Sequence, residues 1–158
     1  MYFLIVLIPS WYLYHFIEYN LHKIGHNHNY NSYLYKIHMN HHKIYYPVSK
    51  LIDKKPYKTG YIYNIPDGLL AYGPSLFLIL SLLYFLFDFY TLVSEILLFA
   101  FLSDYIHTEI HIDGSWLEKY EWFLKKRKLH LLHHKKFMKN MNIIDHTFDK
   151  LKGTYLEN

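Results

Sequence analysis

The sequence predicts an all-α fold: an integral membrane protein of about three transmembrane helices with a helical cap on its cytosolic side. Two observations support this prediction. Histidines recur three and four residues apart, a spacing that places side chains on one face of a helix. In addition, one uncharged stretch is about as long, as a helix, as the hydrocarbon core of a membrane is thick. The 158 residues are expected to form one domain.

The expected membrane helices are three apolar stretches, taken here in chain order. The first covers about 2–21 and lacks the positive start and small-residue cleavage site of a removable signal peptide. The second, 68–87, carries no charge and is about 30 Å long as a helix. A turn at Asp88 should lead into the third, 89–105, which only two acidic residues interrupt. The last two helices would form a hairpin.

The other expected elements lie outside the membrane. The first helix should continue to about residue 26, and a second helix should cover 33–42 and end before Pro47, because the residue before proline disfavours helical backbone. The stretch 48–66 is expected to be irregular. Residues 116–139 should form a long amphipathic helix, followed by a short tail.

Charge is distributed unevenly along the chain. All 17 lysines and arginines lie within 23–58 and 119–152. The positive-inside rule therefore places both stretches, and every histidine cluster, on the cytosolic face, which would be that of the endoplasmic reticulum in a eukaryote. Anionic headgroups account for the formal net charge of +4, and no groove-reading motif suggests a nucleic acid partner.

Histidine is the one residue type whose pattern indicates chemistry. The chain has no cysteine, which excludes disulfides, thiolate zinc sites and iron–sulfur clusters. Of its 13 histidines, ten lie in the four motifs HKIGH, HMNHH, HTEIH and HLLHH. Ten imidazoles exceed the roughly four to six ligands of one ion, so the pattern predicts two ions of iron, zinc, copper or nickel. The expected ligands are His22, His26, His38, His41, His42, His107, His111, His130, His133 and His134.

Several residues near these motifs have secondary roles in the prediction. His28 and His146 are additional candidate ligands, whereas His15 is expected to be a hydrogen-bonded interior residue. Ligating histidines usually donate their other ring N–H to an acceptor. Four acids are close enough in sequence to accept it: Asp104, Glu109, Asp145 and Asp149.

The order and spacing of the four motifs, with a hydrophobic hairpin between the second and third, resemble the fatty acid hydroxylase/sterol desaturase family. The segment FDKLKGT (148–154) is similar to the ending of many members, and SDYIHTEIHIDGSW resembles the fatty acid 2-hydroxylase branch. The resemblance implies that 1–158 is a single domain of this kind. Members usually have a longer amino-terminal region, so this chain is expected to be a minimal version, a fragment, or a homo-oligomer that completes its core with another copy.

The resemblance also implies an activity. The enzyme would be an oxidoreductase that hydroxylates a fatty acyl or sterol-like lipid with two iron ions, which zinc could replace on purification, and with O₂ as co-substrate. Electrons would come from a cytochrome b5-type or other reductase partner. Desaturation by the same kind of site and a non-catalytic metal-binding protein remain alternatives. A haem carrier is disfavoured, because it would need histidines facing one another at membrane depth.

Overall fold

Helices account for nearly all of the regular structure. The computed structural model describes residues 2–28, 32–54, 67–87 and 90–158. Within these ranges, one isolated β-bridge joins Asp53 to Ile112, and the remaining elements are helical, so the predicted all-α class is confirmed. In chain order they are α1 (Tyr2–Gly25), α2 (Tyr33–Asn40), the π-helix η2 (His41–Tyr45), α3 (Asp67–Phe87), α4 (Tyr90–Ile110), the 3₁₀-helix η3 (Trp116–Lys119), α5 (Glu121–Lys135) and α6 (Thr147–Leu151).

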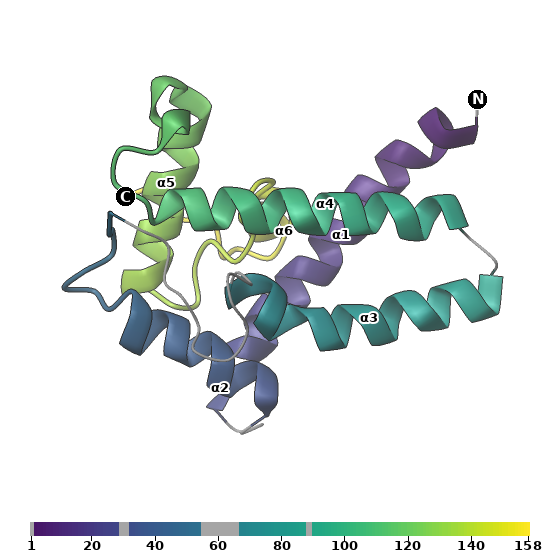
Figure 1. The fold of residues 1–158 in the computed structure, drawn as a ribbon, viewed down its shortest axis with the longest axis horizontal. Coiled ribbons are helices and arrows are strands. Elements are labelled where there is room, and N and C mark those ends of the chain that lie inside the picture. Colours follow the sequence, from purple (N-terminus) through teal and green to yellow (C-terminus); the bar gives the residue numbers. More distant parts are fainter. Residues whose placement is uncertain (1, 29–31, 55–66, 88–89) are drawn as a thin grey trace.

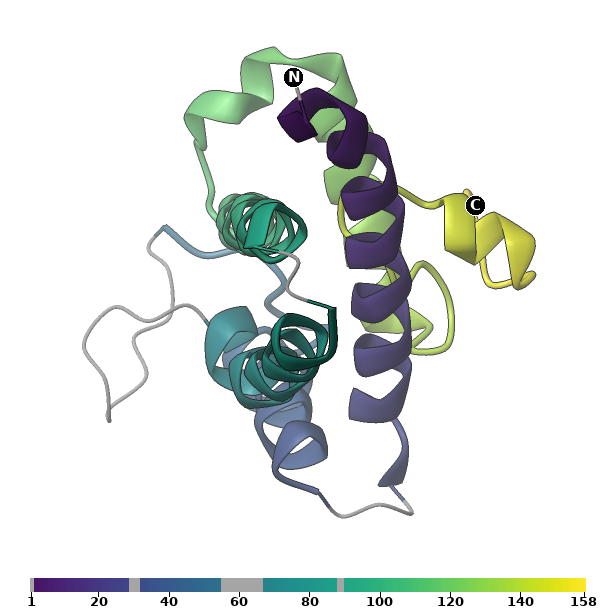
Figure 2. The same cartoon turned by 90° about the vertical axis from the view of Figure 1, so that its right-hand side faces the viewer.

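The long helices α1, α3 and α4 form the centre of the molecule. α3 and α4 run side by side, and α1 crosses them (Figure 1). In the turned view, α1 lies between this pair and the carboxyl-terminal segment that contains α6 (Figure 2). Apolar side chains of all three helices meet in one buried cluster, which includes Tyr14, Ile17, Leu76, Leu80, Ile96 and Phe99. Removal of this apolar surface from water is the main force that holds the helices together.

The amino-terminal half forms the helices expected for it, with one addition. α2 begins after Ser32, whose side chain accepts a hydrogen bond from the backbone N–H of Tyr35 at 3.2 Å, as a helix cap does. The helix then widens into η2, which ends at Tyr45, and Tyr46 follows as its cap directly before Pro47. π-Helical turns of this kind are frequent at functional sites. The turn expected at Asp88 and most of the irregular stretch expected at 48–66 lie outside the described residues.

The prediction of a single long helix at 116–139 is wrong. Ser115 and Glu118 form a capping box around the short helix η3, and Tyr120 then adopts an extended conformation that interrupts the helix. α5 begins after it and ends at Lys135. The expected tail also contains structure, because α6 folds back against α1. Local capping thus overrides the helical periodicity on which the prediction was based.

The predicted integral membrane architecture is wrong as well. In the described part of the chain, no helix is both long enough and apolar enough to cross a membrane. This corrects the three predicted spans at 2–21, 68–87 and 89–105, and with them the predicted localisation at the cytosolic face of a membrane. The physical reason is visible in α1 and α4, whose polar residues pair inside the bundle: Ser10 donates to Glu95 at 2.5 Å, and Ser103 donates to Glu18.

Candidate metal centre

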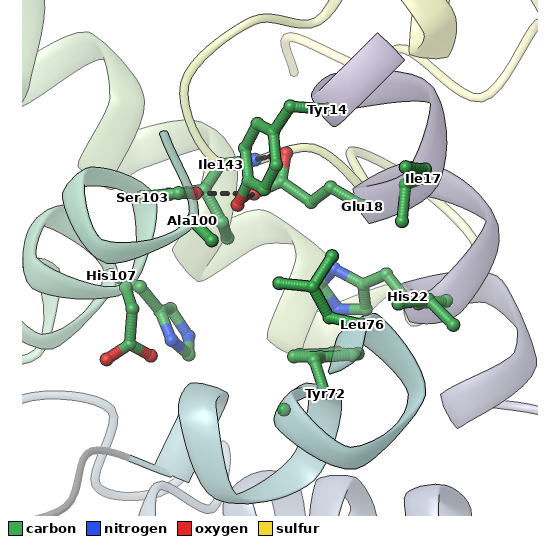
Figure 3. A pocket seen from close by; sticks show the side chains of 13 residues that line it. Tyr14, Ile17, Glu18, His22, Tyr72, Leu76, Ala100, Ser103, His107 and Ile143 are labelled. Carbon is green, nitrogen blue, oxygen red and sulfur yellow. Dashed lines mark hydrogen bonds between the residues drawn. The ribbon is translucent and has the colours of Figure 1, made fainter. Parts of the chain in front are cut away.

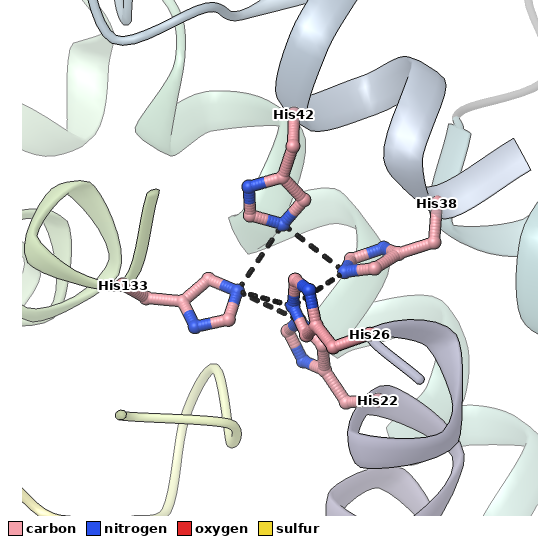
Figure 4. Close-up of side chains that lie close together, drawn as sticks. All are labelled: His22, His26, His38, His42 and His133. Carbon is pink, nitrogen blue, oxygen red and sulfur yellow. Dashed lines mark hydrogen bonds between the residues drawn. The ribbon is translucent and has the colours of Figure 1, made fainter. Parts of the chain in front are cut away.

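Five imidazoles from α1 and the turn directly after it, α2, η2 and α5 converge on one point. Figure 4 shows their rings turned toward one another, with the Nε2 atoms meeting in the middle. Neighbouring Nε2 atoms lie 2.9–3.2 Å apart. We call this set the His22 group; its members are His22, His26, His38, His42 and His133.

A second set of five imidazoles comes from η2, from α5, and from the last turn of α4 with the residue that follows it. Its neighbouring Nε2 atoms are 3.1–3.2 Å apart: that of His130 lies at this distance from those of His107, His111 and His134, and that of His134 from that of His41. We call it the His107 group; its members are His41, His107, His111, His130 and His134. The structure therefore brings together all ten histidines of the four motifs, in two sets that could each hold a metal ion.

The two groups lie next to each other because η2 and α5 contribute to both. In η2, His41 belongs to one group and His42 to the other, and in α5 His134 and His133 are divided in the same way. The rings of His42 and His134, which belong to different groups, have centroids only 4.1 Å apart. Such an arrangement would place two ions side by side, as in a two-metal centre.

Backbone carbonyls orient several of the rings. The Nδ1 atoms of His111, His133 and His134 donate to the carbonyl oxygens of Leu51, Lys139 and Tyr46, at 2.6, 2.7 and 3.1 Å. A ring whose hydrogen is on Nδ1 has a lone pair on Nε2, and in each case that lone pair is directed into its group. Metal-ligating histidines in proteins are held in the same way.

The spacing of the nitrogens fits a shared ion better than it fits hydrogen bonds. His133 Nε2 has three ring nitrogens within 3.2 Å, those of His22, His26 and His42. One lone pair cannot accept three hydrogen bonds of good geometry. Nitrogens bound to a metal at about 2.1 Å and at right angles to each other are about 3.0 Å apart, close to the separations found here.

Burial keeps the imidazoles neutral, the form that binds a metal. Nine of the ten are buried, and His26 is partly buried. Burial lowers the pKa of every member, and for most of them neighbouring imidazoles lower it further, because two close positive charges repel. The pKa falls to about 4 for His107 and His133 and to about 2 for His26.

Gly25 permits the close packing of α1 against α2. A Cβ atom at this position would lie 3.1 Å from Cδ2 and 3.3 Å from Cγ of His38. Both distances are shorter than ordinary van der Waals contacts, so a larger residue would displace the His38 ring. The glycine in HKIGH thus allows the first two motifs to share one group.

A cavity borders both groups. His22 of one group and His107 of the other line it from α1 and α4, and Tyr72 and Leu76 line it from α3 (Figure 3). The rest of its wall is mostly apolar, except for Asp104 and for the end formed by Glu18 and its hydrogen-bond partners. An apolar molecule in this cavity would lie beside both candidate ions.

The other histidines lie outside the two groups. His28 is exposed, and His146 is buried with its Nδ1 atom 2.9 Å from Asp149. His15 is buried and pairs with Glu18 at 3.1 Å, as expected of an interior histidine. Among the described residues, neither of the additional candidate ligands joins a group of potential ligands.

Three of the four acids expected to orient the ligands have other partners. Glu109 accepts a hydrogen bond from Ser115, and Asp145 accepts one from the indole of Trp11 at 2.7 Å. Asp149 accepts backbone N–H groups of the loop after α5, and Asp104 lines the cavity. Backbone carbonyls orient three of the ligands, and the Tyr72 hydroxyl contacts a fourth, His38. No sequence signal identifies a particular carbonyl, since every residue has one.

Comparison of the chain with protein-family models, curated proteins and solved structures gives no match. The resemblance described above therefore stays a prediction from the sequence motifs, and the geometry of the two histidine groups is the structural basis for assigning a function.

Proposed function

We propose that this protein is a non-haem di-iron oxygenase of the fatty acid hydroxylase/sterol desaturase type, which hydroxylates a C–H bond of a lipid. The reaction would insert one atom of O₂ into the C–H bond and release the other as water. Two electrons from a reductase partner, such as a cytochrome b5-type protein, and two protons complete the balance.

The observation that carries the proposal is the pairing of two five-nitrogen groups beside a mostly apolar cavity. Five nitrogens leave one position of a six-coordinate ion for an exogenous ligand. Imidazole ligands alone do not determine which metal binds. The reaction does, because protein side chains cannot oxidise an unactivated C–H bond and zinc is not redox-active. Iron would supply the oxidation chemistry when bound.

The chain's own residues position the substrate and the metal ligands. His22 and His107 bring one edge of each group to the cavity wall, so that a bound substrate lies next to both. The apolar side chains of Leu76, Ala100 and Ile143 exclude water from the reacting carbon. The carbonyls of Lys139, Tyr46 and Leu51 hold three ligands in fixed orientations, which keeps the groups preorganised.

The test is product analysis with purified full-length protein loaded with ferrous iron, a reductase system, a lipid extract and isotopically labelled O₂. We expect a hydroxylated lipid that carries the label, and no such product from His130→Ala or His133→Ala. His28→Ala serves as the control, because His28 is exposed and belongs to neither group. An unsaturated product would identify a desaturase, and unchanged lipids with two bound irons would favour the non-catalytic alternative.

A further inference from the structure

Tyr72 connects the cavity to a candidate metal ligand. Its hydroxyl lies 3.0 Å from Nδ1 of His38, and its ring centroid lies 5.6 Å from that of His38 and 5.8 Å from that of His22. Tyr72 also lines the cavity on the side of His22 (Figure 3). An oxidisable side chain is therefore in direct contact with the His22 group.

We propose that Tyr72 is a redox-active residue, which gives one electron to the metal centre when O₂ reacts there in the absence of a lipid. The product is a neutral tyrosyl radical, and the oxidising centre is consumed before it damages its own histidine ligands. The inference rests on the reaction of a di-iron centre with O₂ that the proposed function requires, but not on the nature of the lipid or its product.

The hydrogen bond to His38 provides the path for the electron. When Nε2 of His38 binds a metal, Nδ1 carries the hydrogen and donates it to the Tyr72 oxygen. One hydrogen bond and one imidazole ring then connect the tyrosine oxygen to the ion. Tyr14 also lines the cavity, but its hydroxyl donates to Glu18, at 3.0 Å, rather than meeting a ligand.

The cavity offers an acceptor for the proton that tyrosine loses when it is oxidised. Because His38 donates to the Tyr72 oxygen, the hydroxyl hydrogen of Tyr72 is directed elsewhere, and the described part of the chain offers it no second partner. The carboxylates of Glu18 and Asp104 line the same cavity and provide acceptors there. The electron and the proton can therefore leave Tyr72 in different directions.

Tyr46 is the comparable residue of the His107 group, but it meets its ligand differently. Its ring stacks on that of His111, with centroids 4.0 Å apart, and it is not part of the described lining of the cavity. Tyr46 thus contacts a ligand through its ring face, whereas Tyr72 does so through the hydroxyl that loses the proton. The geometry favours Tyr72 as the electron donor.

The electrons and protons of this step balance with one external electron. Reduction of O₂ to two molecules of water takes four electrons and four protons. The two ferrous ions supply two electrons, Tyr72 supplies one, and the reductase partner, or a further ferrous ion in vitro, supplies the fourth. The O–H bond of Tyr72 breaks and its proton is one of the four, while solvent supplies the other three. Two ferric ions and the radical remain.

The test exposes full-length protein, loaded with two ferrous ions per chain and a small excess of ferrous iron, to O₂ without lipid. Freeze-quenched samples should give the EPR signal of a tyrosyl radical, and Mössbauer spectra should show ferric iron. Tyr72→Phe should lose the radical signal. The full chain with 3-fluorotyrosine at position 72 alone keeps the ring and the hydroxyl, and its signal should be split by the fluorine nucleus.

Tyr84→Phe is the matched control, because Tyr84 lies on the same helix about three turns further on and pairs with the hydroxyl of Tyr90, at 3.2 Å. It should keep the signal. Mass spectrometry provides a second readout at equal iron content. Oxidised histidine in the peptides that contain His22 and His38 should increase several-fold in Tyr72→Phe, and equal damage in the wild type would show that Tyr72 does not protect the ligands.

The outcomes separate this inference from the proposed function. Ferric iron without a radical, a signal that persists in Tyr72→Phe, or an unsplit signal with fluorotyrosine would each overturn the inference alone. Iron that stays ferrous under O₂ would refute both. Because no lipid is present, failure to hydroxylate a lipid would leave the result of this experiment intact.

Discussion

Glu18 connects three parts of the chain through one carboxylate. It accepts hydrogen bonds from Tyr14 in α1, from Ser103 in α4, and from the side chain of Asn142 in the loop after α5, the last at 2.7 Å. Burial raises its pKa, but hydrogen bonds from His15, Ser103 and Asn142 outweigh this effect and lower the pKa to about 2. The ionised carboxylate therefore stabilises the fold.

This stabilisation predicts a pH dependence. Since the pKa of Glu18 is lower in the folded than in the unfolded chain, its contribution is complete above about pH 4.5 and is lost as the pH falls to about 2. We expect Glu18→Gln to reduce the free energy of unfolding at neutral pH by on the order of 3 kcal/mol. Denaturant titrations of the metal-free proteins should show this difference shrinking between pH 4.5 and 2. A constant difference over that range would show that the charge has no such role.

Gly25 provides a second prediction for a single residue. Gly25→Ala should increase helix propensity but displace His38, because the new Cβ atom would lie 3.1 Å from the ring. We expect about tenfold weaker metal binding by the His22 group, measured by chelator competition, and unchanged binding by the His107 group. Gly73→Ala is the control, since its Cβ atom meets nothing within 4 Å. Equal losses at both groups would argue against this local mechanism.

Among the elements, α6 acts on the metal centre through the loop that precedes it. Asp149 accepts the backbone N–H groups of Met141 and Asn142, at 2.7 and 3.0 Å. These bonds fix the loop after α5, in which the Lys139 carbonyl accepts the Nδ1–H of His133. A short helix outside the ligand motifs thereby orients one of the ligands.

Asp149→Asn tests this connection, because an amide nitrogen would face at least one backbone donor. We expect a loss of about 1–3 kcal/mol in the free energy of unfolding. Metal binding by the His22 group should weaken about tenfold, with the His107 group unaffected. Asp113→Asn, at an exposed position, is the control for the change of charge. If chelator competition shows both groups intact in Asp149→Asn, the loop does not control His133.

The sequence was sufficient to predict most helices and the set of candidate ligands. Apolar runs and histidines at helical spacing located α1, α2, α3 and α4 to within a few residues. The sequence could not predict how the ligands divide between the two groups, since His41 and His42 are neighbours in sequence but belong to different groups. Such a division depends on the rotation of helices relative to one another, which spacing along one helix does not fix.

Other errors have equally specific causes. The membrane spans were predicted from apolar length, whereas residues such as Glu95 and Ser10 pair inside the helix bundle. The long helix at 116–139 was predicted without considering the capping box of Ser115 and Glu118. Interactions between distant segments decided the first of these outcomes and a side-chain cap decided the second. Neither follows from apolar periodicity.

For the whole molecule, the central claim is a two-metal centre divided between the two histidine groups. The most direct measurement is the metal content of purified full-length protein reconstituted with ferrous iron without oxygen, for the wild type, His38→Ala and His111→Ala. We expect two ions per chain in the wild type and one in each variant, with different spectroscopic signatures because a different group remains. A single ion per chain in the wild type, or loss of all metal in both variants, would contradict two separate groups.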